Sequence, residues 1–143
     1  MSTNNLLKNY ETPPAAGNPR EIEAWGLTQA ALRLKAAKES GDIDDVLAAV
    51  RINWQLWTIL QAEMLDPNCP LPADVRGNGV SLANFIDKHS MELIANPVKS
   101  KLDVLININR ELAAGLRTIP PGEEKSTEEA EAPPTSIPGE ITA

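Results

Sequence analysis

The chain contains few side chains that could make or break a covalent bond. It has one cysteine, Cys69, and one histidine, His89. Cys69 lies between Asn68 and Pro70 with no basic residue near it in sequence to favour the thiolate. His89 has no cluster of cysteines or carboxylates at the spacing of metal ligands around it. Because the sequence also lacks a phosphate-binding loop or a dinucleotide fingerprint, it predicts a protein that is no enzyme and uses no cofactor or metal.

The side chains best suited to large apolar contacts are concentrated in residues 53–60, Asn-Trp-Gln-Leu-Trp-Thr-Ile-Leu. This segment holds two of the three tryptophans of a chain with only one Phe and one Tyr. Large aromatic side chains are costly to leave in water and are enriched at binding hot spots. Trp57 lies on the main apolar stripe of the predicted helix and Trp54 lies at its edge. We expect Trp57 to be buried, whereas Trp54 is either a core residue or a contact with a partner.

The helix that carries both tryptophans is apolar around most of its circumference, and two interpretations of it stay open. A helix of this kind is normally buried, which predicts a central core helix. In a small bundle every helix also touches solvent, which predicts that a partner covers part of the apolar flank. The two interpretations differ on whether Trp54, Ile52 and Ile59 are buried within the chain.

Two asparagines, Asn53 and Asn109, interrupt apolar stripes on two different predicted helices. A buried amide without partners costs roughly 1–3 kcal/mol, so each should find hydrogen bonds. We predict that the two side chains meet, directly or through a water molecule, and fix the register of their helices.

Capping residues and breakers divide the sequence into four helices. Asn18 and Pro19 suit a helix start, Gly41 suits a helix end, and Pro67, Pro70 and Pro72 separate the second helix from the third. The predicted helices run from residue 19 to about 40, from about 43 to 64, from 72 to about 95, and from about 97 to 116. We predict an all-α fold, a small four-helix bundle over residues 18–117, with a flexible arm over 1–17 and a disordered, acidic, Pro/Glu-rich tail over 118–143.

Charge and hydropathy narrow the classes of partner. The net charge is −7, and residues 118–143 contribute −5 of it through six glutamates and one lysine. An acidic chain without a basic stripe is a poor ligand for nucleic-acid backbones, so no direct nucleic-acid binding is expected. The sequence has no apolar run of membrane-spanning length and no secretory signal. We therefore expect a cytoplasmic protein without membrane insertion.

Several segments occur together in an order that is typical of one known family. They are Leu56-Trp57-Thr58-Ile59-Leu60, Asn68 with Leu71-Pro72, and Leu105-Ile106-Asn107-Ile108-Asn109-Arg110. Over residues 19–117 the sequence resembles the flagellar biosynthesis regulator FlaF family of alphaproteobacteria. Trp54 departs from this pattern, which is often basic there, and Phe85 stands where the pattern usually has Trp.

The resemblance implies a chaperone-like binder of flagellin that supports flagellin synthesis and export, alongside the companion regulator FlbT. On this basis we expect an amphipathic terminal helix of flagellin to lie in an apolar groove beside the second helix. The candidate groove residues are Trp54, Trp57, Ile59 and Phe85. Asn109 and Arg110 are expected to be structural or to contact a second partner.

Two other functions remain open from the sequence. One is a post-transcriptional regulator that acts mainly through FlbT or a component of the export apparatus. The other is a structural oligomerisation bundle that uses the apolar seam of the fourth helix. The sequence leaves the oligomeric state undetermined.

Overall fold

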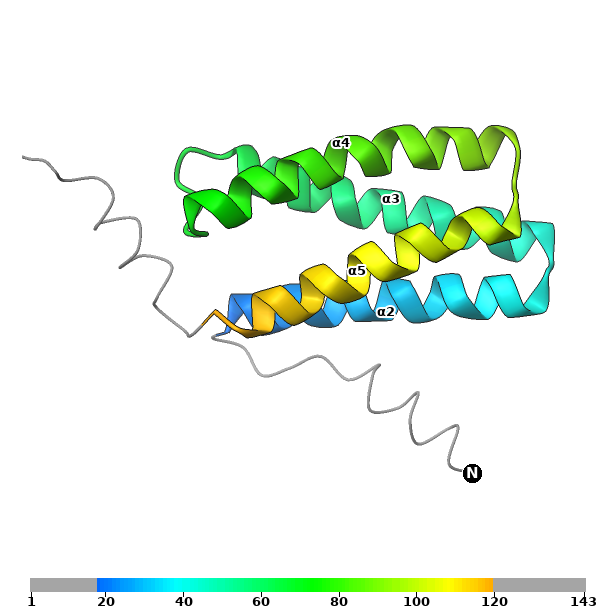
Figure 1. Ribbon diagram of the computed structural model, residues 1–143, viewed down its shortest axis with the longest axis horizontal. Helices are drawn as coiled ribbons and strands as arrows, with labels where there is room; N and C mark the ends of the chain where they lie inside the picture. Colours follow the sequence, from blue (N-terminus) through cyan, green and yellow to red (C-terminus); the bar gives the residue numbers. More distant parts are fainter. Residues whose placement is uncertain (1–17, 120–143) are drawn as a thin grey trace, which may run out of the picture.

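The computed structural model describes residues 18–119, which form an antiparallel bundle of four α-helices (Figure 1). The helices are α2 (Pro19–Ser40), α3 (Ile43–Leu65), α4 (Ala73–Ala95) and α5 (Leu102–Arg117), with a short 3₁₀-helix, η1 (Lys99–Lys101), before α5. The described residues contain no strand, and the predicted all-α class is confirmed. The predicted arm, 1–17, and the predicted tail from residue 120 onward lie outside the described residues.

The ends of α2 are fixed by its neighbours in sequence. The Asn18 side-chain oxygen accepts a hydrogen bond from the Glu21 amide at 3.3 Å. Gly41 ends the helix in the left-handed conformation (φ 72°), which costs an L-residue about 1–2 kcal/mol. Asp42 then caps α3 by accepting from the amides of Asp44 and Asp45. The predicted helix start at Asn18 and helix end at Gly41 are confirmed, and only two residues, Gly41 and Asp42, join α2 to α3.

The C-terminal helix differs from the prediction at both ends. The chain leaves Asn96 and Pro97, turns through η1, and becomes α-helical only at Leu102, later than expected. At the other end the described chain reaches Ile119, whose side chain packs against the core. Ile119 therefore contributes to the core although it lies just beyond the predicted helical region.

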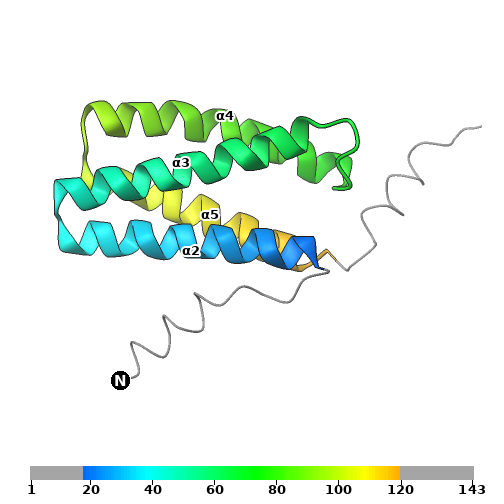
Figure 2. The ribbon, with the colours of Figure 1, turned by 180° about the vertical axis from the view of Figure 1, so that it is seen from behind.

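The four helices form two close pairs. Backbone contacts are extensive between α2 and α5 and between α3 and α4, and they also link α2 to α3. Ion pairs mark both ends of the antiparallel α2–α5 pair: Lys38 with Asp103 at 2.6 Å and Arg117 with Glu21 at 3.5 Å. Seen from the other side, α2 and α3 lie in front and α5 runs behind them (Figure 2). The backbones of α4 and α5 approach each other at few points.

A polar network lies in the centre of the apolar core. Trp57, Asn53 and Asn109 are fully buried. The Asn109 amide nitrogen donates to the Asn53 side-chain oxygen at 2.6 Å, and the Trp57 indole N–H donates to the Asn109 side-chain oxygen at 2.8 Å. Asn109 also donates to the Leu27 carbonyl at 3.4 Å. The predicted meeting of the two asparagines is confirmed, and the network ties α2, α3 and α5 together.

Candidate binding groove

An apolar groove runs between α4 and α5, where the two backbones diverge. It encloses about 580 Å³ and is open to solvent along its length. Its walls are formed by Asn78, Ser81, Leu82 and Phe85 of α4 and by Val104 and Ile108 of α5. We call this feature the α4–α5 groove.

Both α4 and α5 have two apolar faces. One face of each helix packs into the core, and the other forms a wall of the groove. On α5, Val104 and Ile108 are four residues apart and therefore lie on one side of the helix, next to the buried stripe of Leu105 and Asn109. On α4, Leu82 and Phe85 stand in the same relation to the buried Ile86. The groove residues are only partly covered because the backbones of α4 and α5 come close at few points.

Phe85 is the largest side chain in the groove and is 41% exposed. Its ring stacks on the His89 ring, with centroids 5.2 Å apart and an interplanar angle of 17°. His89 Nε2 lies 2.9 Å from the Lys101 carbonyl oxygen and can donate a hydrogen bond to it. Phe85 therefore rests on a side chain that joins α4 to η1, which holds the ring at one end of the groove.

A separate, narrow crevice lies about one helical turn beyond the other end of the groove, since its residues Val75 and Leu112 are three and four positions from the groove residues Asn78 and Ile108. Apolar side chains of three helices line it, with two carboxylates beside them: Leu60, Met64, Leu71, Val75, Leu112 and Leu116, and Glu23 and Glu63. This end lies beside the first turns of α2, because Glu23 belongs to that helix. The groove thus has one end near η1 and one end near the start of α2.

The structure does not bring the predicted site residues together. Trp57 and Asn109 are fully buried, so neither offers a surface to a partner in this fold. Trp54 is half-buried on the seam between α3 and α4, where its indole N–H donates to Asp87 at 2.8 Å. Arg110 is exposed on the opposite α2–α5 side. Among the predicted residues, Phe85 lines the α4–α5 groove.

The flank of α3 that carries Ile52 and Ile59 is exposed, which contradicts one of the two interpretations of that helix and leaves cover by a partner as a prediction. Ile52 is 40% exposed and Ile59 is 60% exposed. The interpretation of α3 as a helix buried all round is therefore wrong. The α4–α5 groove has no α3 residue in its lining, so it is a different surface from the groove predicted beside the second helix, which stays a prediction.

Sequence reasoning missed Leu82, Val104 and Ile108 as groove residues. A signal for two of them was present, because Val104 and Ile108 are four residues apart and so form a second apolar stripe beside the apolar seam of the fourth helix. A helix with two adjacent apolar stripes has more apolar surface than one neighbour can cover. The same criterion, applied to α4, selects Leu82 and Phe85.

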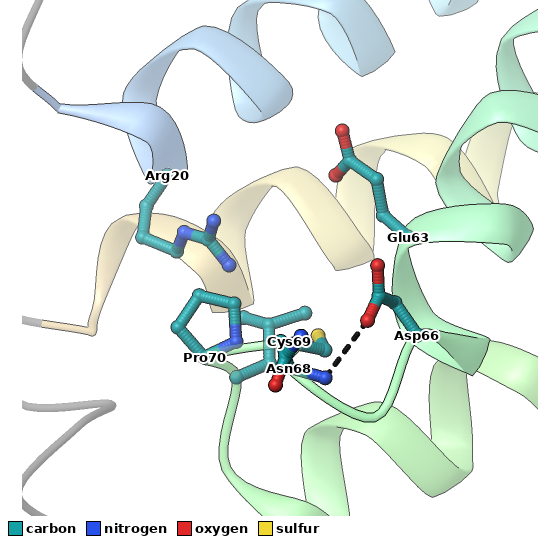
Figure 3. Close-up of a pocket in the computed structure, with 7 residues that line it drawn as sticks. Arg20, Glu63, Asp66, Asn68, Cys69 and Pro70 are labelled. Carbon is teal, nitrogen blue, oxygen red and sulfur yellow. Dashed lines mark hydrogen bonds between the residues drawn. The ribbon is translucent and has the colours of Figure 1, made fainter.

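A second, smaller pocket of about 140 Å³ lies where the start of α2 meets the loop between α3 and α4 (Figure 3). Arg20 projects from α2 toward Cys69 and Pro70 of this loop. Within the loop, the backbone N–H of Asn68 donates to the Asp66 carboxylate at 2.8 Å. Arg20 is almost fully buried and forms an ion pair with Glu23 at 3.2 Å. The fold thus brings a basic residue to the pocket of Cys69, which sequence neighbours alone did not indicate.

Two kinds of site are absent from the part of the chain that the structure describes. Residues 18–119 hold no group of three or more His, Cys, Asp or Glu side chains that could bind a metal ion. Within the same residues no helix has the length and apolar character needed to span a bilayer.

The fold and the groove define a small helical-bundle protein with an apolar groove on its surface. Comparison with known families makes the assignment specific. Residues 8–116, which are 109 of the 143 residues, match the family model described as "Flagellar protein FlaF". The chain belongs to the FlaF family and is a flagellar protein. Searches of curated proteins and of solved structures found no match.

Proposed function

We propose that this protein binds an amphipathic helix of flagellin in the α4–α5 groove and acts as a chaperone that supports flagellin synthesis and export. One observation carries the proposal: four of the six groove residues are apolar, and they form a continuous wall across two helices. Amphipathic helices are recognised in grooves of this kind. Membership of a flagellar family makes flagellin the partner to test first.

The dimensions of the groove suit a short stretch of helix. Asn78 and Phe85 are seven residues apart, which corresponds to about 10 Å along α4 or about two helical turns. A bound helix would place apolar side chains at positions i, i+3 or i+4, and i+7 against Leu82, Phe85 and Ile108. Asn78 and Ser81, at the rim, can hydrogen-bond to the polar edge of the same helix.

Such binding would be chaperone-like because it covers the surface that flagellin uses for assembly. An amphipathic helix that lies in the groove cannot pack at the same time against a second flagellin molecule. The protein would act stoichiometrically, with one groove occupied by one helix. The interaction would then hold flagellin in an export-competent form until the export apparatus takes it over.

The test compares two apolar side chains of equal exposure. We expect Phe85→Ala to weaken binding of purified monomeric flagellin by about tenfold or more, because removing a large aromatic contact typically costs upward of 1 kcal/mol. Ile52→Ala is the matched control, since Ile52 is 40% exposed and Phe85 41%, but Ile52 lies outside the groove. Affinity is measured by isothermal titration calorimetry with the full chain.

The proposed site is wrong if Phe85→Ala binds flagellin as tightly as the wild-type protein, or if Ile52→Ala weakens binding equally.

Co-purification and light scattering test the other two functions. Retention of FlbT or of an export component without flagellin would support a regulator that acts through those partners. A stable homodimer in light scattering with no affinity for flagellin would support an oligomerisation bundle.

A further inference from the structure

The α4–α5 groove ends beside the point where the described chain begins. Glu23 of α2 lines the crevice with Val75, Leu112 and Leu116. Asn18 precedes Glu23 by five residues, which corresponds to about 7.5 Å along the helix axis. Figure 1 also shows the first turns of α2 and the last turns of α5 at the same end of the bundle. Residues that precede α2 therefore start next to the groove.

The chain before α2 is long enough to reach the groove and contains apolar residues that suit it. Residues 1–17 include Leu6, Leu7 and Tyr10. Leu7 precedes Asn18 by eleven positions, and a random-coil chain of that length would span about 18 Å on average. The stretch of α5 from Leu112 to Val104 is about 12 Å long. A segment around Leu7 can therefore reach the middle of the groove without being fully extended.

Charge distinguishes this segment from the other end of the chain. The crevice carries the carboxylates of Glu23 and Glu63. Residues 1–17 contain Lys8 and Glu11 and are neutral overall, whereas residues 120–143 contain six glutamates and one lysine. The acidic segment would be repelled at this end of the groove, whereas the neutral N-terminal segment would not be, and its Lys8 would be attracted to these carboxylates. The family match also begins at residue 8 and so includes Tyr10 and the rest of the chain that leads into α2.

We propose that residues 6–10 occupy the α4–α5 groove of their own chain, with Leu6, Leu7 and Tyr10 against its apolar walls and Lys8 near Glu23 and Glu63. A tethered segment is present at millimolar effective concentration, so weak contacts suffice to keep it bound. The segment then competes with the flagellin helix, a consequence that rests on the proposed function. The groove is covered when flagellin is absent and is opened by displacement.

Paramagnetic labelling of the full chain tests the contact itself. A spin label is attached at Ser2→Cys in a Cys69→Ala background, and the methyl signals of Leu82, Val104 and Ile108 are followed by NMR. Thr142→Cys, labelled in the same background, is the control for the other end of the chain. A Cys69→Val background replaces Cys69→Ala if the latter loses the signal dispersion of the folded protein.

We expect the label at position 2 to broaden the three methyl signals, and the label at position 142 to leave them unchanged. Adding Leu6→Ser and Leu7→Ser to the first labelled protein should restore the signals. The proposal is overturned if the position 2 label causes no broadening, if both labels broaden the groove signals equally, or if the broadening depends on protein concentration. The last result would instead identify a second copy of the chain as the occupant.

A binding measurement separates this proposal from the proposed function. The Leu6→Ser/Leu7→Ser variant should bind monomeric flagellin several-fold more tightly than the wild-type chain, because the competitor has been weakened. Broadening of the groove signals without flagellin binding by any variant would contradict the proposed function and leave the intramolecular contact standing. Flagellin binding at Phe85 without broadening would contradict the intramolecular contact alone.

Discussion

At the scale of single residues, Asn109 is the most connected polar side chain of the core. It accepts one hydrogen bond from Trp57 and donates to Asn53 and to the Leu27 carbonyl. Asn53 is bonded only through its side-chain oxygen, and its amide nitrogen has no partner among the described residues. The two asparagines are equally buried, but the Asn109 side chain makes three hydrogen bonds and the Asn53 side chain makes one. Their substitutions should therefore have unequal consequences.

We expect Asn109→Leu to lower the free energy of unfolding by about 2–4 kcal/mol, because it leaves the Trp57 indole and the Asn53 side chain unsatisfied in the core. Asn53→Leu should cost only about 1 kcal/mol. It removes the acceptor of one Asn109 hydrogen bond, but it also removes the Asn53 amide nitrogen, which has no partner in the core that the structure describes. Urea denaturation of both single variants and of the double variant measures these costs. Equal costs for the two singles, or strict additivity in the double, would contradict a network centred on Asn109.

The asparagine contact could be predicted from the sequence, whereas the place of Trp54 could not. A buried amide must find a partner, and each apolar stripe contained one asparagine, so few solutions were available. Trp54 bonds to Asp87, which lies 33 residues later on another helix. Nothing in the local pattern around Trp54 selects that carboxylate. Its partner depends on how α3 and α4 are packed.

At the scale of the helices, α4 carries two glycines in its first half that have different surroundings. A side chain at Gly79 would collide with the Met64 thioether of α3, whereas no atom of another element lies within 4 Å of the Cβ position at Gly77. The Met64 side chain of α3 therefore packs closely on α4 at Gly79 and not at Gly77.

A matched pair of substitutions follows from this difference. Gly77→Ala should raise the stability by about 0.5–1 kcal/mol, because alanine restricts the unfolded chain and favours the helix. Gly79→Ala should lower it by about 1–3 kcal/mol, since Met64 must move to admit the methyl group. Thermal unfolding followed by circular dichroism compares the two variants. A loss of stability in Gly77→Ala, or a gain in Gly79→Ala, would show that the approach of α3 to α4 is not as described.

Most helix boundaries were predictable because they depend on nearby residues, such as the cap at Asn18 and the left-handed Gly41. The α4–α5 groove was not, because it depends on the distance between two helices rather than on either sequence alone. A regular apolar seam on α5 was compatible with close packing on any neighbour. In the fold this seam is directed toward α2 and the core, which leaves Val104 and Ile108 for the groove.

At the scale of the whole molecule, the bundle consists of two helix pairs that are held together more firmly on one side than on the other. The two-residue connection and the backbone contacts of α2 and α3 close one side. The other side is the α4–α5 groove. A helix bound there would contact both pairs at once and would supply contacts that α4 and α5 do not make with each other.

Binding of flagellin should therefore stabilise the bundle as a whole. At a free flagellin concentration of 100 times Kd, the free energy of unfolding should rise by about 2.7 kcal/mol. Hydrogen exchange measured by mass spectrometry should slow most in peptides that contain Asn78 to Phe85 and Val104 to Ile108. Slowing confined to the exposed flank around Ile52 and Ile59 would place the flagellin surface on α3 and exclude the groove.

The pairing of α2 with α5 also determines when this protein can fold during its synthesis. The ion pair between Glu21 and Arg117 joins residues 96 positions apart, so among the four helices of residues 18–119 the first to leave the ribosome packs against the last. Until α5 has emerged, the apolar stripe of α2, with Leu27 and Leu34, lacks its main neighbour. A nascent chain that stalls before Leu102 would expose that stripe to proteases and general chaperones, and only complete translation of the domain removes the risk.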